Sequence, residues 1–207
     1  MDSEITVMNV IGAQNELQIK FLLEQLISIG IKILNAQEGS LLLADEKKSI
    51  LTFVMQVGKE QKLVGETVPI GEGITGMAAL TRDVQSASAV TGGNFFYVKE
   101  AGMPTSVLAA PMLADDELIG VITAVSFDKK HTFSVEDCST YGMFANIAAA
   151  LVKQQQTLNL LSSPQTEIAS ESTKVEYNLT KSFLELIRTK PQIISVMEQI
   201  INGFKNI

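Results

Sequence analysis

The sequence Gly71-Glu72-Gly73-Ile74-Thr75-Gly76 has the spacing G-x-G-x-x-G, and its interpretation restricts the possible folds more than any other feature of the chain. In a dinucleotide-binding unit this pattern follows a buried parallel strand and is itself followed, further along, by an acidic residue for the ribose. Pro69 lies two residues before the first glycine and lacks the donor that a central strand needs. The downstream segment 87–91 contains no carboxylate, and Glu100 comes only later. The sequence therefore favours a structural glycine turn that leads into a short helix.

The composition is that of a globular protein and disfavours two classes of partner. Of 207 residues, 46% are hydrophobic and 19% are charged, with a formal net charge of −7. Binding to a phosphate backbone needs a basic surface, so we expect no nucleic-acid partner. No apolar run reaches the roughly 18 residues that span a bilayer, and residues 1–4 are acidic where a secretory signal is basic. We therefore expect a cytoplasmic protein without a membrane partner.

The chemistry-bearing residues give no catalytic or metal constellation. Cys138 is the only cysteine and His131 the only histidine, which excludes an internal disulfide and makes a metal site unexpected. His131 is expected in an exposed polar turn and Cys138 in a structural role, because the neighbours of Cys138 in the sequence include no cation that would activate its thiol. We predict no catalytic residue and no metal ligand, and the sequence names no cofactor.

Hydrophobic patterning predicts an α+β domain with an antiparallel sheet flanked by helices. The polar loop 45–49 and the acidic turn 114–117 each join two strands into a hairpin. Ser134 is the expected N-cap of the last helix of this domain. The expected helices span 15–34, 74–80 and 134–161, and the expected strands span 39–44, 50–57, 84–90, 106–113 and 118–127.

The C-terminal part is expected to be a separate unit. Residues 163–176 are rich in Ser, Thr and Glu and predict a linker between a domain at 1–162 and a helical extension at 177–207. The extension contains an apolar helical face, which must bury against the first helix, a second copy of the chain or another protein.

With these elements in order, residues 15–162 resemble a GAF domain, the small-molecule sensor module of signalling proteins. The resemblance implies a GAF-like, profilin-like fold with a five- to six-stranded antiparallel sheet. Five segments carry it in sequence order, namely 39–45, 68–76, 106–112, 119–122 and 133–137.

The resemblance also implies a ligand pocket between one sheet face and the segment 91–105. Aromatic side chains there could close over a planar or apolar molecule, or could instead cover the sheet as ordinary core. Ser126-Phe127 replaces the Asn-Lys pair of cyclic-nucleotide binders, and the position of Cys138 does not suit bilin attachment. The candidate ligand-binding residues are Phe95, Phe96, Tyr97, Met103, Thr105, Ser106, Gly73 and Ile74.

Apolar residues at alternating spacings of three and four in the last helix of the domain fit either a short coiled-coil dimer seam or a core-facing stripe. The candidate dimer residues are Tyr141, Phe144, Ala148, Leu151 and Leu158. The leading functional hypothesis is a stand-alone sensory module that binds an unidentified small molecule and signals through its terminal helices, as a homodimer or to a downstream protein. The alternatives are an interaction scaffold with a filled pocket and a GAF-like reductase, which the single cysteine disfavours.

Overall fold

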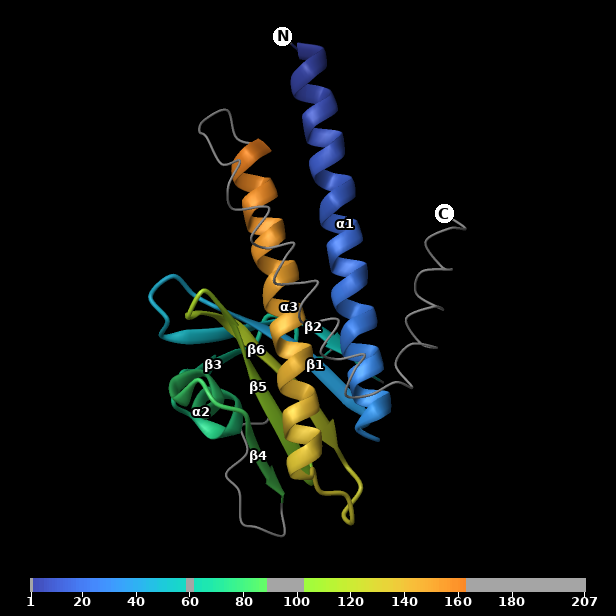
Figure 1. Ribbon diagram of the computed structural model, residues 1–207, viewed down its shortest axis with the longest axis vertical. Helices are drawn as coiled ribbons and strands as arrows, with labels where there is room; N and C mark the ends of the chain where they lie inside the picture. Colours follow the sequence, from blue (N-terminus) through green and yellow to red (C-terminus); the bar gives the residue numbers. More distant parts are fainter. Residues whose placement is uncertain (1, 59–61, 89–102, 163–207) are drawn as a thin grey trace.

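The protein forms one antiparallel sheet with helices on both faces (Figure 1). The computed structural model describes residues 2–58, 62–88 and 103–162, with side chains from residue 16 to residue 157 of these ranges. Within them the strand order is β3-β2-β1-β6-β5-β4, and each neighbouring pair is antiparallel. The elements are α1 (Asp2–Ile33), β1 (Glu38–Ala44), β2 (Ile50–Val57), β3 (Thr67–Pro69), α2 (Gly73–Thr81), β4 (Gln85–Ser88), β5 (Ser106–Ala114), β6 (Glu117–Ser126) and α3 (Val135–Ser162).

The α+β class, both hairpins and the short helix after the glycine turn are confirmed. The differences lie at the ends: α1 begins at Asp2 rather than near residue 15, and β3 is a strand that the sequence did not predict. β3 pairs with β2 alone and therefore forms an edge, which is where a sheet tolerates the missing donor of Pro69. The predicted linker 163–176 and the extension 177–207 lie outside the described residues.

The two faces of the sheet bury two separate cores, because successive side chains of a strand point to opposite sides. Leu41 and Ile122 belong to the core under α1 and α3, whereas their neighbours Leu42 and Val121 belong to the core under α2. Figure 1 shows α1 and α3 side by side along one face and α2 against the other. The sheet thus separates the core beneath α1 and α3, which together form the helical layer, from the core beneath α2.

The helical layer lies unusually close to the sheet. A Cβ atom on Gly39 of β1 would come within 2.6 Å of the Ile27 Cγ2 atom of α1. A Cβ atom on Gly30 of α1 would come within 2.9 Å of the Tyr141 ring of α3. The Tyr141 hydroxyl donates a hydrogen bond of 2.7 Å to the backbone oxygen of Thr123 in β6. Close packing and a hydrogen bond therefore hold α1, α3 and the sheet together as one packed unit.

The start of α3 has the expected N-cap. The Ser134 hydroxyl accepts a bond from the Asp137 amide at 3.1 Å, and the Asp137 carboxylate accepts one from the Ser134 amide at 2.8 Å. This reciprocal pairing satisfies amide groups that a helix leaves without a partner at its start. In the ranges that the structure describes, no helix is both long and apolar enough to cross a membrane.

Candidate functional site

The eight predicted ligand-binding residues fall into three groups. Phe95, Phe96 and Tyr97 lie outside the described residues. Met103 is exposed, and the Thr105 hydroxyl lies 2.9 Å from the backbone oxygens of both Ser126 and Asp128. Ser106 is fully buried at the start of β5, so the structure gives this serine internal partners rather than an open position.

Gly73 and Ile74 form the start of α2, and the glycine hexapeptide is a turn. Gly71 and Gly73 have φ angles of 94° and 61°, a region that favours glycine. The Gly71 amide donates to the oxygen of Gly76 at 2.9 Å, and a Cβ atom on Gly76 would clash with the backbone of Pro69. Ile74 packs against the core under α2. The prediction of a structural turn that seats a short helix on the sheet is confirmed.

His131 corrects one expectation, because it is half-buried rather than exposed. Its Nε2 atom lies 2.9 Å from the backbone oxygen of Leu34, and its Nδ1 atom lies 3.3 Å from the Ser106 hydroxyl. A carbonyl only accepts, so Nε2 carries the proton, and in the neutral ring Nδ1 accepts from Ser106. The ring also meets Phe133 edge-on at a centroid distance of 4.8 Å. His131 therefore links the end of α1 to the start of β5.

Four of the predicted dimer residues face the core of the chain itself, which is one of the two alternatives that their spacing allows. Tyr141, Phe144 and Ala148 are 0%, 1% and 0% exposed, and Leu151 is 5% exposed, all against the chain's own core. The 3–4 spacing therefore marks a core-facing stripe at these four positions. The side chain of Leu158 lies beyond the described ones.

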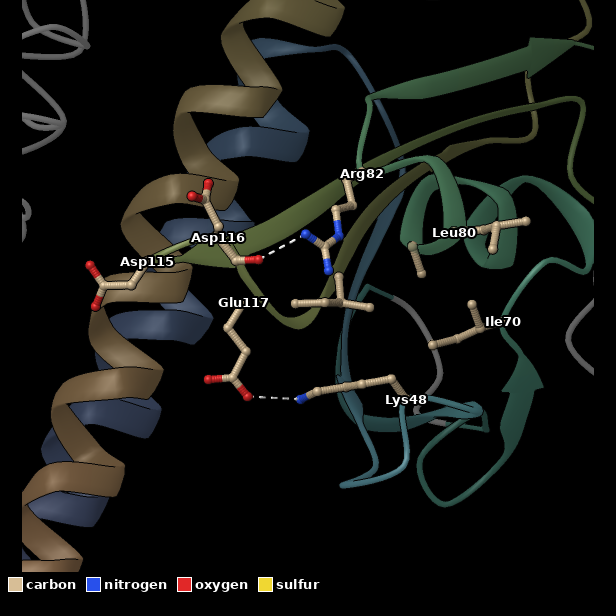
Figure 2. Close-up of a pocket in the computed structure, with 9 residues that line it drawn as sticks. Lys48, Ile70, Leu80, Arg82, Asp115, Asp116 and Glu117 are labelled. Carbon is tan, nitrogen blue, oxygen red and sulfur yellow. Dashed lines mark hydrogen bonds and ion pairs between the residues drawn. The ribbon is translucent and has the colours of Figure 1, made fainter.

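A pocket of about 450 Å³ opens at the other end of the sheet from Ser106, between α2, the β1–β2 loop and the β5–β6 turn (Figure 2). Of the predicted ligand-binding residues that the structure describes, none lines it, and its walls come from the β1–β2 loop, the residue after β3, the end of α2 and the β5–β6 turn. The lining residues are Lys48, Ile70, Ala79, Leu80, Arg82, Asp115, Asp116, Glu117 and Leu118.

The pocket contains paired charges of both signs. Glu117 lies between two lysines, with 3.2 Å from its Oε1 to the Lys48 Nζ and 3.8 Å from its Oε2 to the Lys153 Nζ of α3. The Arg82 guanidinium donates to the backbone oxygen of Asp116 at 2.9 Å. Glu117 therefore connects the pocket to α3 by charge.

The tight β5–β6 turn directs its own carboxylates away from the pocket. Asp115 and Asp116 have φ angles of 50° and 62°, as a two-residue hairpin turn of the primed type requires. Figure 2 shows both carboxylates pointing away from the Arg82 guanidinium, toward the side of α3. Among the described residues, no group of three or more His, Cys, Asp or Glu side chains is placed to hold a metal ion.

Comparison with known proteins gives a family and a fold. The family model described as GAF domain matches residues 16–153, and a search of curated proteins finds no match. The GAF-B domain of DevS from Mycobacterium smegmatis is 16% identical with a TM-score of 0.57, covering 69% of this chain and 98% of that one. The GAF domain of a phosphoenolpyruvate-protein phosphotransferase from Coxiella burnetii is 19% identical with a TM-score of 0.60, covering 75% and 98%. A type II free methionine-R-sulfoxide reductase from Thermoplasma acidophilum is 18% identical with a TM-score of 0.57, covering 68% and 96%.

Proposed function

Because the chain belongs to the GAF domain family, we propose that it is a cytoplasmic sensory module that binds a small molecule and passes the binding event to its helices α1 and α3. The ligand contacts one side of the sheet, and the output surface is the helical layer on the other side. In this proposal the partner of that layer is a second copy of the chain or a downstream signalling protein.

The observation that carries the proposal is the pair of polar links between the sheet and the helical layer. The Tyr141 hydroxyl joins α3 to β6, and His131 joins the end of α1 to Ser106 at the start of β5. Ser106 comes directly after the segment 91–105, which the family resemblance makes the ligand-proximal part. A ligand that changes the path of this segment would move Ser106, and thereby the end of α1.

The homodimer in this proposal uses the outer side of α1. Leu17 is 68% exposed on that side of the helix. Burial of Leu17 in a two-fold contact would stabilise a dimer by the ordinary hydrophobic effect. Light scattering of Leu17→Glu against the unchanged chain tests it, because a dimer held by this surface becomes a monomer in the variant.

We propose no enzymatic activity, although reductases share the fold. The Cys138 thiol is half-buried near the start of α3 and packs against the core, and the chain has no second cysteine with which to form a disulfide. The substitution Cys138→Ser should therefore leave ligand binding and signalling unchanged. A methionine sulfoxide reductase activity that disappears in Cys138→Ser would contradict the proposal.

Thermal-shift screening of the full chain tests the sensory function. Nucleotides, amino acids, haem and aromatic acids are the probes, because a ligand that binds the folded state raises the apparent stability by mass action. We expect at least one class to raise the melting temperature in a concentration-dependent way. A flat response to every class would favour the interaction scaffold instead.

A further inference from the structure

We propose that the pocket between Arg82 and Lys48 binds a small carboxylate with an apolar body, and that Glu117 reports its occupancy to α3. The inference goes beyond the proposed function, since it adds a second ligand site, names a ligand class for it and gives it a separate route to the helical layer. The pocket lies where β5 ends and β6 begins, at the opposite end of β5 from Ser106.

Arg82 is the group that selects an anion. A guanidinium has five N–H donors, and the described contacts use one of them, to the oxygen of Asp116. No carboxylate of the described residues lies within ion-pair distance of Arg82. Figure 2 shows its guanidinium directed toward the space in front of Lys48. A planar fork with free donors matches a carboxylate in a bidentate arrangement.

The rest of the lining selects an apolar body for the ligand. Ala79 and Leu118 are buried side chains of the pocket wall, and Ile70 is half-buried. Leu80 is 59% exposed, which is high for a leucine beside a cavity. A volume of about 450 Å³ is in the range of small-molecule sites and much larger than one inorganic phosphate needs. An aliphatic or aromatic acid fills this space and covers Leu80, whereas a bare anion does neither.

The surrounding acidic groups lower the expected affinity of the pocket for an anionic ligand. Asp115 and Asp116 belong to the turn beside the pocket, and the whole chain carries a net charge of −7, so long-range repulsion opposes an anion. Their carboxylates point away from Arg82, and salt screens exposed charges beyond about 8 Å at physiological ionic strength. We therefore expect binding in the millimolar range, about 10⁻³ M, for ligands of about ten heavy atoms.

Glu117 supplies the link to the helical layer. It is shared between Lys48 at the pocket and Lys153 on α3, and a ligand carboxylate near Arg82 competes with it for Lys48. Once Lys48 turns to the ligand, Glu117 is left to Lys153. Lys153 lies directly after the buried Leu151 and Val152 of α3, so the exchanged ion pair acts on a packed part of that helix. Exposed ion pairs are weak, so the change should appear in local protection of α3 rather than in global stability.

Two variants separate binding at Arg82 from a general effect of charge. Arg82 has a φ angle of 59°, and asparagine tolerates this left-handed region, so Arg82→Asn keeps the backbone of the helix end. Lys129→Asn is the matched control, because it removes one positive charge at an exposed position just beyond the end of β6, and the pocket lies at the start of that strand. Both variants are made in the full chain and compared with it by circular dichroism before binding is measured.

Ligand-observed NMR titrations with benzoate and hexanoate test the site, with benzamide and inorganic phosphate as comparison probes. We expect both acids to bind, benzamide and phosphate to bind at least about tenfold more weakly, and Arg82→Asn to weaken the acids by about 10- to 100-fold while Lys129→Asn does not. Equal binding of benzamide, equal binding of phosphate, or equal losses in the two variants would overturn the inference.

Hydrogen exchange with benzoate tests the link through Glu117. In the unchanged chain benzoate should alter exchange in the turns of α3 around Lys153. In Glu117→Gln benzoate should bind more tightly, since Lys48 is freed, and the response of α3 should be lost. An unchanged α3 response in Glu117→Gln would overturn the relay.

The outcome also distinguishes this inference from the proposed function. A compound from the wider thermal-shift screen that stabilises the chain and Arg82→Asn equally, with no binding of benzoate or hexanoate, removes the acid site and leaves the sensory function standing. Binding of benzoate that depends on Arg82, but produces no change in α3, would instead overturn the relay through Glu117 and would not bear on the route through Ser106.

Discussion

Removing the Tyr141 hydroxyl should lower the free energy of unfolding by a defined amount at neutral pH. Tyr141 is completely buried, and its hydroxyl donates to the Thr123 oxygen at 2.7 Å, so Tyr141→Phe deletes one internal hydrogen bond and keeps the ring. A buried bond of this kind contributes about 1.5 kcal/mol, including the cost of the unpaired partner. We expect the free energy of unfolding to fall by about that amount and the melting temperature by about 5 °C.

The same substitution should change the response to alkaline pH. Burial raises the pKa of the Tyr141 hydroxyl well above its ordinary value of 10.0. The folded state therefore keeps a proton that the unfolded state loses, and this contribution to stability is present below pH 10 and lost as the pH rises further. The loss is about 1.4 kcal/mol per pH unit. At pH 11 it cancels the advantage of the hydrogen bond, so the unchanged chain and Tyr141→Phe should unfold with nearly equal free energies.

Urea unfolding of both proteins, followed by circular dichroism at pH 7, 9, 10 and 11, measures this difference directly. Lysines and the other tyrosines titrate in both proteins, so their effects cancel in the comparison. A gap of about 1.5 kcal/mol at pH 7 that closes by pH 11 is the expected result. A gap of the same size at every pH, or none at pH 7, would refute the assignment of Tyr141 as a buried donor between α3 and the sheet.

Three further substitutions test the packing and the turns. Gly39→Ala places a methyl group within 2.6 Å of the Ile27 Cγ2 atom. It should lower the free energy of unfolding, measured by urea titration, by about 1–3 kcal/mol. An unchanged urea midpoint would mean that α1 does not lie so close to β1. Ser134→Ala removes the N-cap of α3 and should cost about 1 kcal/mol, with Ser134→Thr as the control that retains it. Asp45 accepts hydrogen bonds from the backbone of Ile50 and from Ser49, and these bonds lower the pKa of its carboxyl group. The stability that Asp45 contributes is therefore present above its ordinary pKa of 3.8. It is lost as the pH falls through the lower pKa of the folded state. Asp45→Asn should therefore lower the melting temperature at pH 7, and the difference from the unchanged chain should shrink at acidic pH; a difference independent of pH would contradict this.

Local patterns in the sequence predict most of the sheet and the short helix, because their signals lie within a few residues. The acidic turn with Asp115 and Asp116 fits the primed type that joins β5 to β6, and Pro69 correctly excludes a central strand. The N-terminal part of α1, before residue 15, could not be predicted from local patterns. Gly12 and the β-branched residues before it are poor helix formers. β3 was missed because three residues are too few to show alternation.

The candidate site was less predictable, because its parts come together only in the folded chain. His131 meets Leu34, 97 residues earlier, and no local pattern signals such a contact. Apolar residues at spacings of three and four, such as those that begin at Tyr141, occur both in coiled-coil seams and on helix faces that pack against a domain core. The spacing alone could therefore not separate a dimer seam from a core-facing stripe. The pocket of Lys48 and Arg82 combines a hairpin loop with a helix end, and the charges in each segment suggest only a solvated turn when taken alone.

The central claim is that ligand binding on one side of the sheet changes the helical layer on the other. Native mass spectrometry of the full chain, with hydrogen exchange measured before and after removal of any small molecule that co-purifies, tests it most directly. The account predicts a bound mass whose removal changes exchange both near Ser106 and in α1 and α3. A chain that carries such a molecule and shows identical exchange in α1 and α3 with and without it would contradict the account.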